Sequence, residues 1–112
     1  MNIGLAIKSI RKKLGIPQHE LAEKCLISQS ALSLIENGVK TPSQKTIAKV
    51  CQVLEIPEAI IYLVAMQETD VSESKRGVYK LVYPSLMSLA LQIVNTEHLN
   101  LLEPKMLVKE PA

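Results

Sequence analysis

The sequence contains neither Phe nor Trp, and Tyr occurs only three times in 112 residues. Any hydrophobic core must therefore be built from Leu, Ile, Val, Ala and Met. Enough of these residues are present, because 47% of the chain is apolar and only 21% is charged, which is not the composition of a disordered chain. A length of 112 residues suits one domain, or one small domain with an appendage.

Residues that commonly bind metals or carry out catalysis are scarce. Cys25 and Cys51 lie in apolar patterns, outside any Cys-x-x-Cys pair or Cys/His cluster, and His19 and His98 are isolated. We therefore expect buried free thiols and no metal site. The four glycines are scattered, so they form no phosphate-binding loop, and no nucleophile is paired with a base. These absences predict a protein that is not an enzyme and has no cofactor.

Long hydrophobic runs are also missing. No apolar stretch approaches the roughly 20 residues of a membrane span, and four basic residues interrupt the first 14, unlike a signal peptide. We therefore expect a cytoplasmic protein that makes no use of a membrane. The net charge is only +2, with eight Lys/Arg and five Glu in residues 1–66. This mild excess favours contact with phosphates, but it suits an ordinary solvated surface equally well.

The spacing of apolar residues predicts five short helices within residues 1–66. The first helix ends near Gly15, and Pro17 suits the first turn of a second helix that extends to Cys25. After a brief turn, Ser28 can cap a third helix that runs to Glu36. The residues expected to face inward are Ile3, Ile7, Ile10, Leu14, Leu21, Ala22, Cys25, Leu32, Ile35, Ile47, Val50, Cys51, Leu54, Ile60, Ile61 and Val64.

Two further helix starts follow. In the fourth helix, Thr41 is expected to cap, Pro42 to occupy the first position and Gln44 to complete a capping box. Ile56-Pro57 opens the fifth helix. The sequence thus predicts an all-α fold, with a five-helix domain over residues 1–66 and a C-terminal helical extension over residues 67–112.

The extension contains one strongly apolar helical segment. Residues 67–76 are polar and suit a linker or a frayed helix start, whereas residues 78–94 form a helix that is apolar most of the way round. Pro84 either kinks this helix or marks its first turn. From Asn95 onward there is no strong period, and Pro104 and Pro111 argue against a long helix. One apolar stripe contains Leu86, Leu89, Ala90 and Ile93, and a second contains Met87, Leu91 and Val94.

The stretch from residue 18 to residue 38 carries the functional signal. Two short helices joined by a tight turn, with Ala22, Leu32 and Ile35 between them, describe a helix-turn-helix. Ala22 is small, which lets the two helices cross closely. The outer face of the second helix carries short polar groups that suit a DNA major groove about 12 Å wide. Without this surrounding pattern, the same polar groups would indicate only a solvated face.

These residues resemble the phage-repressor and Cro-like (Xre-type) family of helix-turn-helix regulators. The resemblance covers about residues 3–66 and includes the five-helix layout. It implies a lambda-repressor-like fold and binding to double-stranded DNA. Two positions depart from the family pattern: Leu26 stands where a turn Gly is usual, so we expect a re-shaped turn, and Pro17 replaces a capping Thr or Ser. The matching residues are Gln18, Glu20–Lys24, Ile27-Ser28, Ile35–Gly38 and Thr41-Pro42.

The resemblance also implies residue roles. Gln18 would bond a phosphate, and Asn37 and Lys40 would anchor the DNA backbone just past the recognition helix. Arg11 and Glu36 would form a buried structural ion pair. On the recognition helix, Gln29 could pair with an adenine and Leu34 could touch a thymine methyl group. The full set of expected DNA-binding residues is Gln18, Ser28, Gln29, Ser30, Ser33, Leu34, Asn37 and Lys40.

A single helix-turn-helix covers one half-site, so we expect a homodimer on a palindromic operator. The fifth helix and the helix over residues 78–94 are the expected dimer surface. The alternative is that this helix folds back on its own domain, and both arrangements can hold at once. Tyr62, Tyr79 and Tyr83 are expected to fill the core or an interface. The functional prediction is a transcriptional regulator, acting as a repressor; the alternative is an antitoxin-like or adaptor protein that grips a partner through the C-terminal helix.

Overall fold

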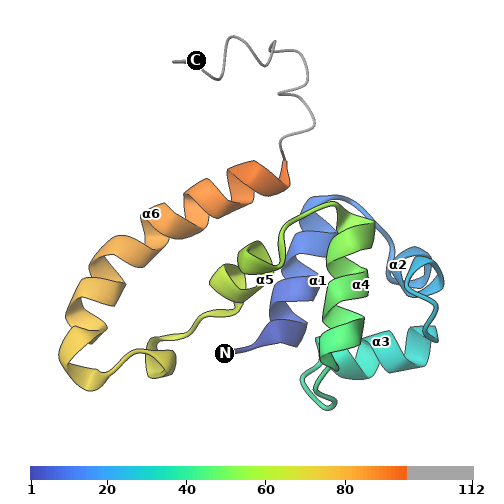
Figure 1. Ribbon diagram of the computed structural model, residues 1–112, viewed down its shortest axis with the longest axis horizontal. Coiled ribbons are helices and arrows are strands. Elements are labelled where there is room, and N and C mark those ends of the chain that lie inside the picture. The colour runs from blue at the N-terminus through green and yellow to red at the C-terminus, as the bar shows by residue number, and fades with distance from the viewer. Residues whose placement is uncertain (96–112) are drawn as a thin grey trace, which may run out of the picture.

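The computed structural model describes residues 1–95, and every regular element in this range is helical (Figure 1). The predicted all-α, lambda-repressor-like fold with a helical extension is confirmed. The expectations for the tail beyond Asn95 and for His98 lie outside the described residues. The elements are α1 (Ile3–Lys13), α2 (Gln18–Lys24), α3 (Gln29–Glu36), α4 (Gln44–Leu54), α5 (Glu58–Ala65), the 3₁₀ turns η1 (Glu68–Asp70) and η2 (Glu73–Lys75), and α6 (Arg76–Val94).

Side-chain caps set the start of three helices in the head, by which we mean α1–α5. Asn2 caps α1, its side-chain oxygen accepting from the Leu5 N–H at 2.9 Å. Ser28 caps α3 as predicted, its hydroxyl accepting from the Ala31 N–H at 3.0 Å. The predicted cap of α4 is wrong. Ser43 performs this role, accepting from the Thr46 N–H at 3.1 Å, so the helix begins two residues later than expected. Pro17 and Pro57 occupy the cap positions of α2 and α5, just outside the first turns.

Left-handed backbone conformations mark several connections between the helices. Gly15 and Gly38 follow α1 and α3 with φ of +71° and +77°, where glycine has no steric cost. Leu26, in the turn between α2 and α3, has φ of +60°, and Glu55 after α4 has φ of +57°. The expected re-shaping of the turn is therefore wrong: Leu26 itself takes the conformation that a glycine would adopt.

The core lies where the apolar periodicity predicted. The inward-facing prediction is confirmed for all of α2–α5, while Ile3 and Leu14 at the ends of α1 are only partly buried. At one point α1 approaches α3 closely: a Cβ atom added at Gly4 would overlap the backbone carbonyl oxygen of Ile35. The crossing of α1 and α3 therefore depends on a residue without a side chain. The largest side chains with almost no exposure are Ile7, Ile10, Leu21, Leu32, Val50 and Ile61.

The extension packs one face of α6 on the head. Ala90 and Val94 are buried, and Met87 and Leu91 pack partly against the core. The Tyr83 hydroxyl donates to the Leu63 carbonyl at 2.8 Å, and the Tyr79 hydroxyl donates to the Met66 carbonyl at 3.2 Å. Leu63 lies in the last turn of α5, where its carbonyl also accepts from the Met66 N–H at 3.3 Å, and Met66 is the residue that follows the helix. The two tyrosines therefore tie α6 to the end of α5, a role beyond the filling expected of them.

The other face of α6 remains exposed. Val78, Val82, Leu86 and Leu89 recur at intervals of four, four and three residues and are 41–60% exposed; we call them the α6 stripe. Pro84 lies inside the helix rather than in its first turn, and Figure 1 shows α6 curving. The helical stretch over residues 73–94 is long and apolar enough to cross a membrane, by length and composition alone. The sequence-based exclusion of such a segment was therefore wrong.

Candidate nucleic-acid interface

Helices α2 and α3 pack together as a helix-turn-helix. Ala22 and Leu32 are 2% and 0% exposed, and Ile35 is also buried, so the apolar faces of both helices are fixed to the core. This packing leaves the opposite face of α3 toward solvent. Gln29 and Ser30 are exposed there, because the helical period that buries one side of α3 turns them outward.

Three more of the predicted contact residues lie along α3, and they differ in their availability. Ser33 is half-buried, and its hydroxyl accepts from the Asn37 amide at 3.4 Å. Leu34 is 44% exposed, which is high for a leucine in a short helix. Ser28 is exposed, but its hydroxyl oxygen accepts the capping bond from Ala31. Of these three residues, Ser28 and Leu34 are thus exposed and Ser33 is half-buried.

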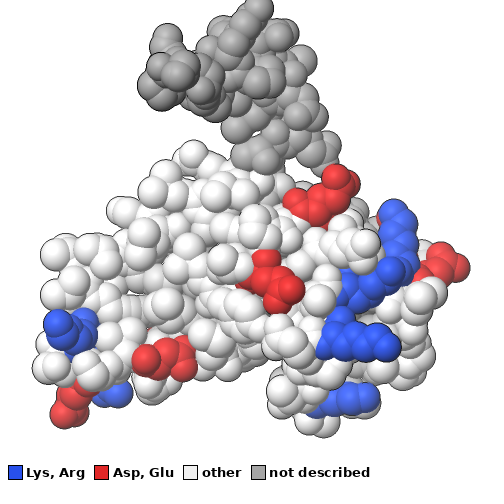
Figure 2. Space-filling view, in the orientation of Figure 1, with Lys and Arg blue, Asp and Glu red and all other residues white. Residues whose placement is uncertain are grey.

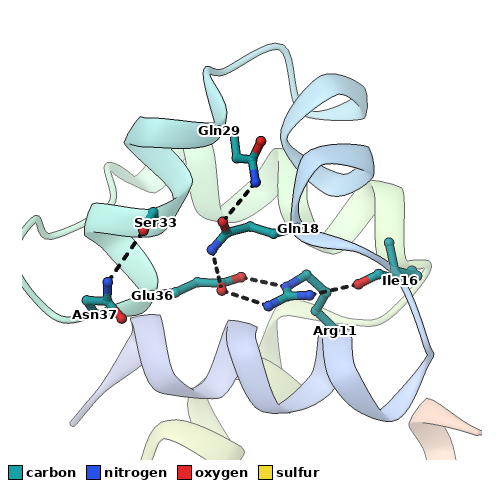
Figure 3. A network of polar contacts seen from close by, with 7 residues as sticks. All are labelled: Arg11, Ile16, Gln18, Gln29, Ser33, Glu36 and Asn37. Carbon is teal, nitrogen blue, oxygen red and sulfur yellow. Dashed lines mark hydrogen bonds and ion pairs between the residues drawn. The ribbon is translucent and has the colours of Figure 1, made fainter.

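A polar chain connects α3 to the interior (Figure 3). Arg11 donates from Nε to Oε2 of Glu36 at 2.8 Å and from Nη2 to Oε1 at 2.9 Å, so the expected buried ion pair is confirmed. The third arm of the guanidinium, Nη1, donates to the Ile16 carbonyl at 2.8 Å. Arg11 and Glu36 are only 7% and 4% exposed. Two-point pairing of a planar guanidinium fixes the carboxylate firmly in position.

Gln18 extends this chain toward the surface. Its amide nitrogen donates to Oε1 of Glu36 at 3.0 Å, and its amide oxygen accepts from the Gln29 amide at 3.3 Å. A carboxylate can only accept, so Glu36 dictates which end of the Gln18 amide faces it. The amide orientation of Gln29 is set in turn, and its oxygen points away from Gln18 in Figure 3.

Within the protein, the side-chain amide of Gln18 is engaged by Glu36 and Gln29, so it supports α3. Sequence reasoning missed this link, because residues 11 positions apart on different helices leave no local signal. The predicted contact of Gln18 with a phosphate, through its amide or its N–H, stays a prediction. Asn37 and Lys40 are exposed in the connection after α3, where the resemblance placed its backbone anchors.

Charge is distributed unevenly over the molecule. Figure 2 shows basic side chains gathered on the part of the head that contains α2 and α4. The surface over most of α6 carries no charge in the same view, and residues 81–95 contain no Asp, Glu, Lys or Arg. The basic side of the head is electrostatically suited to a polyanion, and the uncharged helix is not.

The two cysteines lie in the core as free thiols, as expected. Burial raises the pKa of Cys25, with a smaller opposing effect from Lys49. Burial, together with the charge of Glu58, raises the pKa of Cys51 to about 11. Both thiols are therefore protonated at neutral pH and are poor nucleophiles, as suits residues that fill space.

The comparisons with known proteins agree with this geometry. Residues 7–61 match the protein family described as helix-turn-helix, which spans α2, α3 and most of the head. A search of curated protein sequences finds no match.

A solved structure is also similar: the clp gene regulator ClgR from Corynebacterium glutamicum, with 27% identity and a TM-score of 0.58, covering 77% of this chain and 92% of that one. The aligned 77% of this chain is longer than residues 1–66, so the similarity to ClgR continues into the extension. Residues 7–61 therefore form a helix-turn-helix domain that matches the phage-repressor and Cro-like (Xre-type) family, and the two comparisons together support a DNA-binding transcriptional regulator.

Proposed function

We propose that the protein is a cytoplasmic repressor that binds a palindromic operator in double-stranded DNA as a homodimer. Residues 1–66 are the DNA-binding domain in this proposal, and residues 67–112 are the dimerisation extension. The observation that carries the proposal is the exposed Gln29 amide on α3, held by Gln18 and through it by the buried Arg11–Glu36 pair. A pre-oriented amide loses little conformational entropy when it meets a base edge.

The proposal gives α3 the role of a recognition helix in the major groove. The Gln29 oxygen accepts from adenine N6, and the second N–H of its amide donates to N7. Ser30 and Ser33 contact neighbouring base edges or phosphates, and Leu34 contacts a thymine methyl group. Ser28, Asn37 and Lys40 bind phosphates on either side of the helix, and Gln18 both steadies Gln29 and lies at the edge of this surface. Repression follows if the bound dimer excludes other proteins from the same DNA.

Replacing Gln29 by alanine should weaken operator binding by about 1–3 kcal/mol, because a bidentate contact with adenine is lost. The measurement is fluorescence anisotropy at fixed salt on an operator found by selection from random duplexes. Gln92→Ala is the matched control, since Gln92 is exposed on α6 and should leave the affinity unchanged. Equal affinities for wild type and Gln29→Ala on that operator would refute the role of Gln29.

The α6 stripe supports the dimer. Its four apolar side chains are exposed on a helix whose other face is already packed on the head. A second copy would cover this surface and place two recognition helices about 34 Å apart, in successive major grooves. The absence of charge from residue 81 to residue 95 means that pairing two such faces buries no unpaired ion.

Placing two carboxylates in the stripe, as in Leu86→Glu/Leu89→Glu, should convert the dimer to a monomer and weaken operator binding about a hundredfold or more, since cooperation between half-sites is lost. Sedimentation velocity at micromolar concentration measures the first effect and anisotropy the second. Ser88→Glu is the control, because Ser88 is exposed on another side of α6. A wild-type protein that sediments as a monomer would contradict the dimer directly.

The same stripe supports a second candidate function. An antitoxin-like or adaptor protein would use α6 to hold a different protein in place of a second copy. Stoichiometric co-purification of such a partner, together with no DNA affinity at low salt, would favour this function over the first. A protein that binds both DNA and a partner would combine the two.

A further inference from the structure

A hollow of about 580 Å³ lies between the α2–α3 turn and one face of α4. Ile27 and Ala48 contribute apolar surface to it, and the sulfur-bearing side chain of Cys25 lies beneath. Thr46 and Gln52 add polar groups at the edge, and none of its lining residues is acidic. We call this surface the turn hollow. The DNA-binding role proposed above uses none of these side chains.

Leu26, at the rim of the turn hollow, is unfavourable for folding in two ways. Its φ of +60° is a conformation that glycine adopts without steric cost and leucine does not. Its side chain is 84% exposed, more than any other large apolar side chain among residues 1–95. The packing of the head therefore gives no reason for a leucine here. The left-handed backbone ends α2, as it ends α4 at Glu55: the Ile27 N–H donates to the Ala22 carbonyl at 3.1 Å. It is the exposed leucine side chain that lacks a structural role.

Lysines form the opposite rim. Lys45 and Lys49 are separated by one helical turn of α4, so they project from the same face. Within the described part of the chain, neither lysine forms a salt bridge. The turn hollow thus offers two unpaired cations beside an apolar surface, in the region where Figure 2 shows basic side chains gathered.

We propose that the turn hollow docks an acidic segment of a partner protein that carries an apolar side chain. The apolar side chain packs between Leu26 and Ala48, while carboxylates of the segment pair with Lys45 and Lys49. A DNA phosphate would satisfy the lysines but would leave the leucine without a partner. The apolar surface therefore favours a protein ligand over DNA.

The position of the turn hollow gives this docking a use. Leu26 and Ile27 directly precede Ser28, the cap of α3, so a docked partner lies next to the N-terminus of the proposed recognition helix. A regulator bound to its operator could in this way hold a second protein at the same DNA. The docking does not depend on α6 or on a dimer, because all the lining residues belong to α4 and to the connection between α2 and α3.

The test selects peptides from a random dodecapeptide library on the full-length protein, with the Lys45→Glu/Lys49→Glu variant used to remove peptides that bind elsewhere. We expect enrichment of peptides with at least two acidic residues beside a Leu, Ile or Phe. A synthetic copy of the best peptide should bind the charge-reversed variant about tenfold or more weakly. Failure to enrich such peptides would overturn the proposal.

Two further variants keep the result interpretable. Leu26→Gly relieves the backbone, so it should be at least as stable as the wild type, yet it should bind the peptide about tenfold more weakly because the apolar contact is lost. Lys80→Glu is the control: it reverses a charge on α6, where Lys80 pairs with Glu68 at 3.3 Å, and it should leave peptide binding unchanged. Lys45→Ala/Lys49→Ala could instead weaken operator binding and reduce the slope of its salt dependence by the amount expected for about two phosphate contacts. In that case the lysines contact DNA and the proposal is wrong.

Discussion

Replacing Gly4 by alanine should lower the free energy of unfolding by about 3 kcal/mol or more, a large part of the stability of a small domain. The new Cβ would overlap the carbonyl oxygen of Ile35 and lie 2.8 Å from its carbonyl carbon. These are backbone atoms of α3, so no side-chain rotation can relieve the clash. Helix α1 must move away from α3, which opens the core around Ile7 and Leu32.

Urea unfolding followed by circular dichroism measures this effect. Gly77→Ala is the matched control: a Cβ at Gly77 meets nothing within 4 Å, and alanine favours the helix by about 0.5–1 kcal/mol. The two substitutions are chemically identical, so their difference isolates the crossing of α1 and α3. Equal urea midpoints for Gly4→Ala and the wild type would show that the crossing is looser than described.

Replacing Glu36 by alanine should destabilise the fold by about 3–5 kcal/mol, because the buried Arg11 guanidinium is left without its counter-charge. Gln18 loses its acceptor in the same step. Glu20→Ala is the control, since Glu20 pairs with Lys24 at 3.3 Å across side chains that are 41% and 58% exposed. Such a surface pair contributes about 1 kcal/mol or less. Thermal unfolding of both variants makes the comparison.

A second variant separates the stability of the fold from DNA recognition. Arg11→Met/Glu36→Leu replaces both buried ions with apolar groups. Such a double replacement often leaves the stability of the fold unchanged or raises it, whereas removal of one partner lowers it. Stability should largely return, whereas operator affinity should remain reduced, because nothing then orients Gln18 and Gln29. If the double variant binds the operator as the wild type does, the polar chain has no part in positioning Gln29.

The sequence predicts the head well because its signals are local. Apolar residues spaced three and four apart indicated the buried faces of α2–α5, and Gly15 follows the helix that it was expected to end. The start of α4 was misjudged because two overlapping patterns compete there. Thr41 and Ser43 each precede a residue three positions later that could complete the cap, and nothing local decides between them.

Other features depend on contacts that the sequence does not encode locally. The link from Gln18 to Gln29 exists only because α2 and α3 cross at the right angle. The periodicity of α6 gave two apolar stripes but could not say which one packs on the head. Ala90 and Val94 turn inward because their side of the helix also carries the tyrosines that reach α5.

The hydrogen bonds of the two tyrosines connect the extension to the head. Helix α6 cannot leave the head without breaking the hydrogen bond from the Tyr83 hydroxyl to the Leu63 carbonyl. Helix α5 lies against α1, and α1 carries Arg11, the anchor of Glu36. Contiguous contacts therefore join α6, through α5 and α1, to the Arg11–Glu36 pair that holds Gln18 and, through it, Gln29.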